Sequence, residues 1–364
     1  SEGILWRSSG DGEFQVASAD KEQPGTEIIL TLRDAEPDNG LADFTEEWPI
    51  RETVKKYSDF VQYPIELKVT RSEPVAVEGE SDVEGSDETE SAKFETVVKW
   101  ETINSQKAIW TRSSSDVTDE EYAEFYKHIA RDWEDPFKTI RFSAEGTFEY
   151  QALLFIPGRA PYDLFYRDQK FGLQLYANRV LIKDPADELL PEWLRFMKGV
   201  VDSPDLSLNV SREILQQDRR LGSIRKRIVK KTIETLLQLQ KEDREKYGTF
   251  WNSFGRVLKE GTADMEHSDK VAPLLWFQSS NDVDGLTSLA EYVERMGDDQ
   301  EDIYFMTGES RAAVEASPHL EAFLDKGIEV LYLVDPVDEI MVSHLNEFDG
   351  KSLKSVGKGI VDLG

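Results

Sequence analysis

The sequence predicts an α/β fold, with an α+β N-terminal part followed by two α/β layered subdomains that helices join. Short apolar runs typical of strands alternate along the chain with segments that have the 3.6-residue period of helices. Apolar residues make up 39% of the 364 residues, with 8 Trp and 18 Phe, which is enough for two or three cores. The run 330–334, Val-Leu-Tyr-Leu-Val, is apolar throughout, as in strands that are buried on both faces.

The first segment, 1–72, begins with strand patterns and contains one amphipathic helix. Pro24 and Gly25 mark a turn between two of the strands. We expect strands at 4–6, 13–16, 26–32 and 63–69, and a helix at 50–60.

An acidic segment follows, over 73–97. From Glu73 to Glu90 there are eight Asp or Glu residues and no Lys, Arg or aromatic residue. Such a stretch repels itself and buries too little apolar area to offset the entropy of ordering it, so we predict a flexible linker. An acidic decoy that binds a basic partner is the alternative.

The range 98–240 forms the large α/β subdomain. Thr118 is expected to cap a helix that runs to about Arg131, with acidic residues in its first turn. Strands are predicted at 148–155 and 173–182, and helices at 193–197 and 221–239, the last with apolar residues at spacings of three and four. This long helix also carries a basic cluster, interpreted as a solvated face, with a phosphate-bearing ligand or an acidic partner as alternatives: Arg219, Arg220, Arg225, Lys226, Arg227, Lys230 and Lys231.

A helical connector, 241–275, leads to a small α/β subdomain, 276–358, and residues 359–364 remain. The connector contains an aromatic helix at 247–258, and a short apolar helix is expected at 273–278. In the small subdomain we predict helices at 289–296 and 310–316 and strands at 302–307 and 329–334.

Composition excludes several classes of function. The net charge of -29 excludes nucleic acid as a partner, because binding to phosphates depends on a surplus of Lys and Arg. The absence of Cys excludes disulfides and zinc-thiolate sites, and the four His residues are too far apart for a local metal motif, so no metal site is predicted. No run approaches the roughly 20 apolar residues that span a bilayer, and Ser1-Glu2-Gly3 does not begin a signal peptide. We therefore expect a cytoplasmic protein without a membrane partner.

Residues 199–217 carry the strongest signal for a site. Arg212 and Gln216 lie one helical turn apart, after a turn at 202–205 that contains Pro204. A guanidinium held at a helix start can bind a phosphate or a carboxylate through two hydrogen bonds. By chemistry alone, a partner in a surface salt bridge is the alternative.

The run 206–217, Leu-Ser-Leu-Asn-Val-Ser-Arg-Glu-Ile-Leu-Gln-Gln, resembles the signature of the middle segment of the heat-shock protein 90 chaperones. Other blocks match the family in the same order: 55–60, 63–65, 110–112, 132–136, 155–165 and 303–310. The resemblance covers nearly the whole chain except about 73–95.

This resemblance implies a division into domains. Segment 1–72 would be the C-terminal part of an ATP-binding domain, 73–97 the charged tether between the first two domains, and 359–364 the start of a C-terminal dimerisation domain. The family's motifs for the ATP pocket do not occur in the sequence. ATP with Mg²⁺ is then the cofactor of a full-length parent, and we expect no tight binding by this fragment and no ATPase activity of the fragment alone.

The resemblance also assigns roles to four residues. Arg212 would contact the γ-phosphate of ATP as the catalytic group, and Gln216 would support that contact. Thr26 would be a nucleotide contact; alternatively Gly25 supplies a turn and Thr26 starts a strand. Trp133 would lie on a surface that binds clients; alternatively a neighbouring strand shields it.

The implied function is that of part of an ATP-dependent chaperone. Its partners would be unfolded or partly folded client proteins, the missing N-terminal ATPase domain and, in the full-length parent, a second copy in a homodimer. The alternative function is that of a protein-binding module that works without nucleotide.

Overall fold

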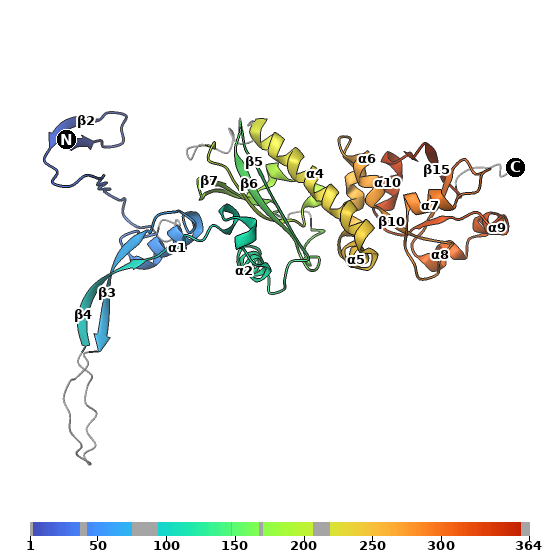
Figure 1. Cartoon of the computed structure of the whole chain (residues 1–364), viewed down its shortest axis with the longest axis horizontal. Helices are drawn as coiled ribbons and strands as arrows, with labels where there is room; N and C mark the ends of the chain where they lie inside the picture. The colour runs from blue at the N-terminus through green and yellow to red at the C-terminus, as the bar shows by residue number, and fades with distance from the viewer. Residues whose placement is uncertain are drawn as a thin grey trace, which may run out of the picture. The chain divides into compact units, whose positions relative to one another are not determined.

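The computed structural model describes residues 3–36, 42–74, 94–146, 148–166, 170–206 and 219–357. The chain divides into two compact units, Ser1–Glu52 and Thr53–Gly364, which are described separately (Figure 1). None of the helices in the described ranges is long and apolar enough to cross a membrane. The mixed α/β fold predicted from the sequence is confirmed.

The first unit contains an antiparallel hairpin of β1 (Gly3–Arg7) and β2 (Gln15–Ala19), and helix α1 (Glu47–Tyr57) spans the boundary between the units. Residues 26–32, all of them described, form no regular strand, so that prediction was wrong. Ile28, Ile29 and Leu30 are 76%, 85% and 73% exposed. A strand needs a neighbour for its backbone groups and a layer over its apolar side chains, and these side chains have no such cover.

The second unit begins with a ribbon of two antiparallel strands, β3 (Glu66–Pro74) and β4 (Phe94–Thr102). Their register runs from Glu66 opposite Thr102 to Pro74 opposite Phe94. Both ends of the range predicted as a linker are therefore strand residues, and the acidic residues 75–93 lie outside the described ranges. Since Pro74 and Phe94 are paired, the chain leaves and re-enters the same ribbon on either side of this segment.

The range 98–240, predicted as the large subdomain, contains a five-stranded mixed sheet in the order β5-β6-β9-β7-β8. Only β7 and β9 are parallel. The strands are β5 (Lys138–Ala144), β6 (Tyr150–Ile156), β7 (Leu173–Ala177), β8 (Val180–Ala186) and β9 (Lys198–Asp202). The single strand predicted at 173–182 is a hairpin, because Asn178 and Arg179 adopt positive φ values of 49° and 66° and turn the chain.

Helices cover both faces of this sheet (Figure 1). On β6, Leu154 and Ile156 pack in the core with α4 (Arg219–Glu242) and α5 (Arg244–Lys259). Leu153 and Phe155 point the other way, into the core with α2 (Asp119–Ala130). Thr118 caps α2 in a reciprocal pair with Glu121, which confirms the predicted start of this helix.

The prediction of a helix at 193–197 was wrong. A 3₁₀ turn, η5 (Glu192–Leu194), is followed by a turn at 195–197, and β9 then starts at Lys198. Trp193, Leu194, Phe196 and Met197 are all buried, and a short apolar run of this kind does not distinguish a helix from a buried turn and strand.

The range 276–358, predicted as the small subdomain, contains a six-stranded sheet in the order β11-β10-β13-β12-β15-β14, with β12 parallel to β13 and β15. The helix expected at 273–278 is a 3₁₀ turn, η7 (Ala272–Leu274), followed by a strand. The strands are β10 (Trp276–Ser279), β11 (Thr287–Ser288), β12 (Ile303–Thr307), β13 (Leu331–Leu333), β14 (Glu347–Phe348) and β15 (Lys351–Ser355). The helices are α7 (Leu289–Arg295), α8 (Arg311–Glu315), α9 (Pro318–Asp325) and α10 (Asp338–His344), and η6 (Glu260–Ala263) and α6 (Ser268–Val271) lie in the connector.

Candidate functional site

The predicted site residues Arg212 and Gln216 lie outside the described ranges. The structure does describe the chain on both sides of residues 207–218: the end of β9 with the turn 202–206, and the start of α4. We call residues 202–206 the loop base.

The first residue of the loop base, Asp202, is a buried carboxylate held by two donors. Its Oδ2 accepts a hydrogen bond of 3.0 Å from Nε1 of Trp110, and its Oδ1 accepts one of 3.1 Å from the backbone N of Arg179. Trp110 and Asp202 are 1% and 7% exposed. A buried charge is tolerated when donors satisfy it, so these two bonds fix where β9 ends.

The rest of the loop base is tied to the large sheet. Ser203 is fully buried; its Oγ donates to the carbonyl of Glu149 at 2.5 Å, and its backbone N donates to the carbonyl of Tyr176 at 3.2 Å. Oδ2 of Asp205 accepts from the backbone N of Glu149 at 2.7 Å, and Leu206 is buried in the core. The turn predicted at 202–205 is thus confirmed, and it has a defined geometry.

The start of α4 is tied to the loop base as well. Arg220 donates from Nη1 to the carbonyl of Asp205 at 2.7 Å, and its guanidinium lies 5.6 Å from the ring centroid of Phe148. Arg220 therefore joins the first turn of α4 to the loop base.

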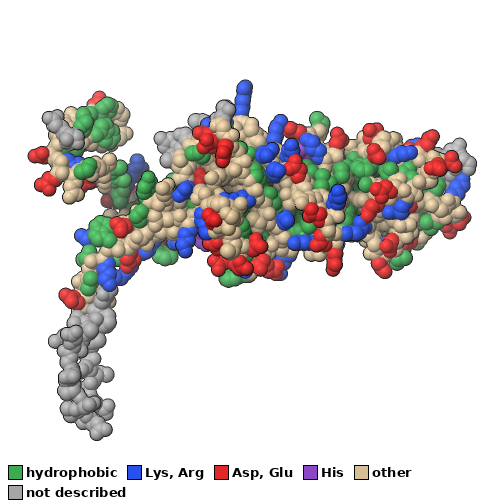
Figure 2. Space-filling view, viewed as in Figure 1, with side chains coloured by type: hydrophobic (Ala, Val, Ile, Leu, Met, Phe, Trp, Pro, Cys, Tyr) green, Lys and Arg blue, Asp and Glu red, His purple; other side chains and the backbone are tan. Residues whose placement is uncertain are grey.

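Lys and Arg side chains gather over α4 in a chain whose net charge is -29 (Figure 2). Lys226 pairs with Glu266 at 2.8 Å and Lys231 with Glu234 at 2.9 Å, as the interpretation of a solvated, charge-compensated face requires. Among the described residues, Arg225 and Arg227 have no ion-pair partner, so the alternative of an anionic partner stays open.

Trp133 lies on the turn after α2 and is 92% exposed, so the alternative that a neighbouring strand shields it is wrong. Asp132 orders this turn: its Oδ1 accepts from the backbone N of Trp133 at 2.7 Å, and its Oδ2 accepts from the hydroxyl of Tyr126 at 2.7 Å. Burial alone would raise the pKa of the Asp132 carboxyl, but these hydrogen bonds outweigh it and hold the pKa below its usual range. The turn that presents Trp133 is therefore fixed at neutral pH.

A second loop, 157–166, adds exposed aromatic residues that sequence reasoning missed. Arg159 joins it to the Trp133 turn through an ion pair of 3.2 Å with Glu134. Tyr162 and Tyr166 are 87% and 65% exposed, and their ring centroids lie 6.3 Å apart, edge to face. Their spacing of four residues in a polar, Pro-containing loop was the available signal.

Thr26 is exposed and belongs to the first unit. Gly25 has a φ of 141°, so it does supply a bend, but Thr26 does not start a strand. The proposed contact between Thr26 and a nucleotide remains a prediction.

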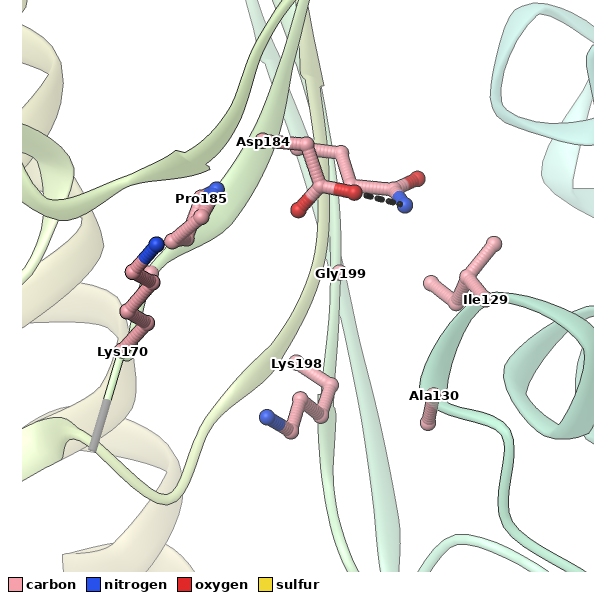
Figure 3. Close-up of a pocket in the computed structure, with 9 residues that line it drawn as sticks. Ile129, Ala130, Lys170, Asp184, Pro185, Lys198 and Gly199 are labelled. Carbon is pink, nitrogen blue, oxygen red and sulfur yellow. Dashed lines mark hydrogen bonds between the residues drawn. The ribbon is translucent and has the colours of Figure 1, made fainter. Parts of the chain in front are cut away.

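A cavity of about 140 Å³ opens on the α2 side of the large sheet (Figure 3). The last residues of α2 and the side chains of Lys170, Lys198 and Asp184 surround it, and Gln174 donates to Asp184 at 3.1 Å. This volume corresponds to a few water molecules and is well below the several hundred Å³ of sites for drug-sized ligands, so it does not fit a nucleotide. The described residues contain no group of three or more Asp, Glu or His placed to hold a metal ion.

Comparison with known proteins identifies the family. The model of the Hsp90 protein family matches residues 43–364. The chaperone protein HtpG of Nocardia farcinica is 52% identical over 99% of the chain, and that of Mycobacterium leprae is 51% identical over 98%. The chain spans about half, 54%, of the length of each of these relatives.

Among solved structures, the middle domain of a putative heat shock protein from Plasmodium falciparum is similar. It superposes with a TM-score of 0.61 at 34% identity, and the match covers 69% of the chain and 100% of that domain. The extent of the family match and the likeness to this middle domain agree with the resemblance seen in the sequence. The chain therefore belongs to the heat-shock protein 90 family and contains the middle domain of that family.

Proposed function

We propose that the chain is part of an ATP-dependent molecular chaperone, in which it binds non-native client proteins and supplies Arg212 to the γ-phosphate of ATP. The observation that carries this proposal is the loop base: Asp202, Ser203 and Asp205 fix the start of the segment that bears Arg212 to the large sheet. A catalytic arginine needs such a rigid support, because a small displacement of a charged group costs much of its effect on the barrier.

In this mechanism Arg212 acts on a nucleotide that another domain holds. ATP with Mg²⁺ supplies the γ-phosphate, and the guanidinium stabilises the negative charge that develops on it during hydrolysis. Gln216 supports the same contact. Because the arginine reaches the phosphate only in a closed arrangement, nucleotide binding shifts the population toward closed molecules. The exposed Ile28, Ile29 and Leu30 fit a partner domain that covers them.

Isothermal titration calorimetry with ATP tests whether another domain, and not this chain, binds the nucleotide. We expect the chain alone to give no heat of ATP binding, because the family's motifs for the ATP pocket do not occur in its sequence and the cavity on the α2 side of the large sheet is too small for a nucleotide. A chimera in which the chain replaces the matching segment of Nocardia farcinica HtpG should bind and hydrolyse ATP, since the two are 52% identical. If the folded chimera binds clients but does not hydrolyse ATP, the alternative of a nucleotide-independent binding module is correct.

The replacement Trp133→Ala should weaken binding of an unfolded protein about 10-fold. An exposed Trp on a fixed turn can bury a large aromatic surface against a client, and such residues dominate binding energy at interfaces. The measurement is fluorescence anisotropy of a labelled, reduced and carboxymethylated α-lactalbumin titrated with the chain.

The matched control is Trp100→Ala, because Trp100 is also exposed, at 64%, but lies on the β3/β4 ribbon. We expect Trp100→Ala to bind the labelled α-lactalbumin as tightly as the unsubstituted chain does. Both variants should unfold at the same temperature as the unsubstituted chain. Equal loss of binding in the two variants would show that client binding does not depend on the Trp133 turn.

A cytoplasmic location, and a homodimer as the state of the full-length protein, remain predictions.

A further inference from the structure

We propose that Trp110 is a positioning residue for ATP hydrolysis, linking the segment 59–65 to the loop base through one side chain. This inference rests on the proposed function, since it concerns how Arg212 is held. In the proposed mechanism Trp110 contacts neither the γ-phosphate that Arg212 binds nor any other part of the nucleotide. Its role follows from what contacts each end of its indole ring.

The first part of the link is a clamp between residues 59–65 and 103–106. Asn104, which is 7% exposed, accepts at Oδ1 from the backbone N of Ile65 at 2.8 Å and donates from Nδ2 to the carbonyls of Val61 and Tyr63, each at 3.0 Å. Oδ1 of Asp59 accepts from the backbone N of Ser105 at 2.8 Å. These bonds make the two stretches, which flank the β3/β4 ribbon, one rigid piece.

The second part is the insertion of Phe60 from this clamp into the aromatic core beneath α2. The ring of Phe60 packs edge-on against Trp110, with centroids 4.9 Å apart and planes at 73°. It also packs against Tyr176 of β7, at 5.9 Å, and Trp110 itself lies 5.3 Å from Tyr176. A displacement of the clamp must therefore move Phe60 within a close-packed cluster, and Trp110 with it.

The third part is the polar end of the same ring. Nε1 is the only donor of a Trp side chain, and here it donates to Oδ2 of Asp202, where β9 ends and the loop base begins. If the ring shifted, it would leave a buried carboxylate oxygen without its donor, which is costly. A displacement of Phe60 would therefore shift the indole ring and, through the hydrogen bond to Asp202, the loop base.

The variant Trp110→Phe separates this role from simple packing, because Phe keeps most of the ring contacts with Phe60 but lacks Nε1–H. In the chimera we expect kcat for ATP hydrolysis to fall about 10-fold, with KM for ATP unchanged, since the arginine is misplaced and the nucleotide pocket is untouched. In the chain itself, hydrogen exchange at the backbone N–H groups of Ser203 and Leu206 should become faster.

The matched control is Trp193→Phe. Trp193 is 3% exposed and donates from Nε1 to Oδ2 of Asp264 at 3.1 Å, a bond of the same kind that joins η5 to the residues before α6. We expect it to lower the unfolding temperature about as much as Trp110→Phe does, without changing kcat or the exchange of Ser203 and Leu206.

Equal effects of the two variants on kcat and on exchange would reduce Trp110 to a packing residue and overturn the proposal. Unchanged exchange at Ser203 and Leu206 in Trp110→Phe would overturn it as well, whatever happens to hydrolysis. Should Arg212→Ala leave kcat unchanged in the chimera, the proposed function itself fails, and the exchange measurement still decides whether Trp110 holds the loop base.

Discussion

Replacing Lys259 by Ala should lower the free energy of unfolding by about 3–5 kcal/mol, the typical cost of removing one partner from a buried ion pair. Lys259 is the last residue of α5 and is 4% exposed. Its Nζ lies 2.7 Å from Oδ2 of Asp335 and 2.7 Å from Oδ1 of Asp338. Asp338 is 1% exposed, so without the cation a buried carboxylate would have no counter-charge. Urea unfolding of parent and variant measures the difference.

The loss should depend on pH, because Asp338 can be buried at lower cost once it is protonated. Burial already raises the pKa of the Asp338 carboxyl in the parent, and the Lys259 ammonium opposes that rise. Removing Lys259 raises this pKa further. The free-energy cost of burying the Asp338 carboxylate is absent at a pH below its usual pKa of 3.8, where the carboxyl is neutral in both the folded and the unfolded state. The cost grows as the pH rises toward the pKa of the folded state. The gap between parent and variant should therefore be wider at pH 8 than at pH 5.

Lys226→Ala is the matched control. Lys226 forms an ion pair of 2.8 Å with Glu266, but the two side chains are 67% and 54% exposed. Solvent screens such a pair, so we expect a loss below about 1 kcal/mol. If Lys259→Ala costs no more than Lys226→Ala, the junction of α5 with Asp335 and the start of α10 does not depend on this buried cation.

The sequence predicted those elements whose signal is local. The apolar stripe at 221–239 became α4, and Thr118 caps α2 as expected. The errors at 193–197 and 273–278 fall on short buried runs, where neither length nor period distinguishes a helix from a strand. The error at 173–182 came from Asn178 and Arg179, which reverse the chain without a glycine. The failed strand at 26–32 shows that an apolar, β-branched run becomes a strand only when a neighbour pairs with it.

The candidate site divides in the same way. The turn at 202–205 was predictable because Pro and Asp act locally, whereas the bond from Trp110 to Asp202 joins residues 92 positions apart. The Lys259 cluster likewise joins α5 to Asp335, 76 positions further along the chain. The exposure of Trp133 could not be predicted from its charged neighbours in the sequence, because it depends on the hydrogen bonds by which Asp132 orders the turn. Arg212 itself was found through its motif rather than through any property of composition.

Arg212→Ala in the chimera should lower kcat for ATP hydrolysis at least about 100-fold and leave KM for ATP nearly unchanged. Removing one preorganised donor to a developing negative charge costs on the order of 10²–10³ in kcat, and arginines supplied from a second domain contribute more. Arg212→Lys should recover only part of the rate, because a lysine keeps the charge but not the planar fork. Steady-state phosphate release measures both variants.

Arg225→Ala provides the control, because Arg225 lies on α4, close in sequence to the same segment, and has no ion-pair partner among the described residues. It changes the net charge by the same amount as Arg212→Ala, so a general electrostatic effect would lower kcat equally in both. We expect the parent's kcat for Arg225→Ala. Turnover that survives Arg212→Ala undiminished would remove this arginine from the mechanism, and the loop base would then serve protein binding alone.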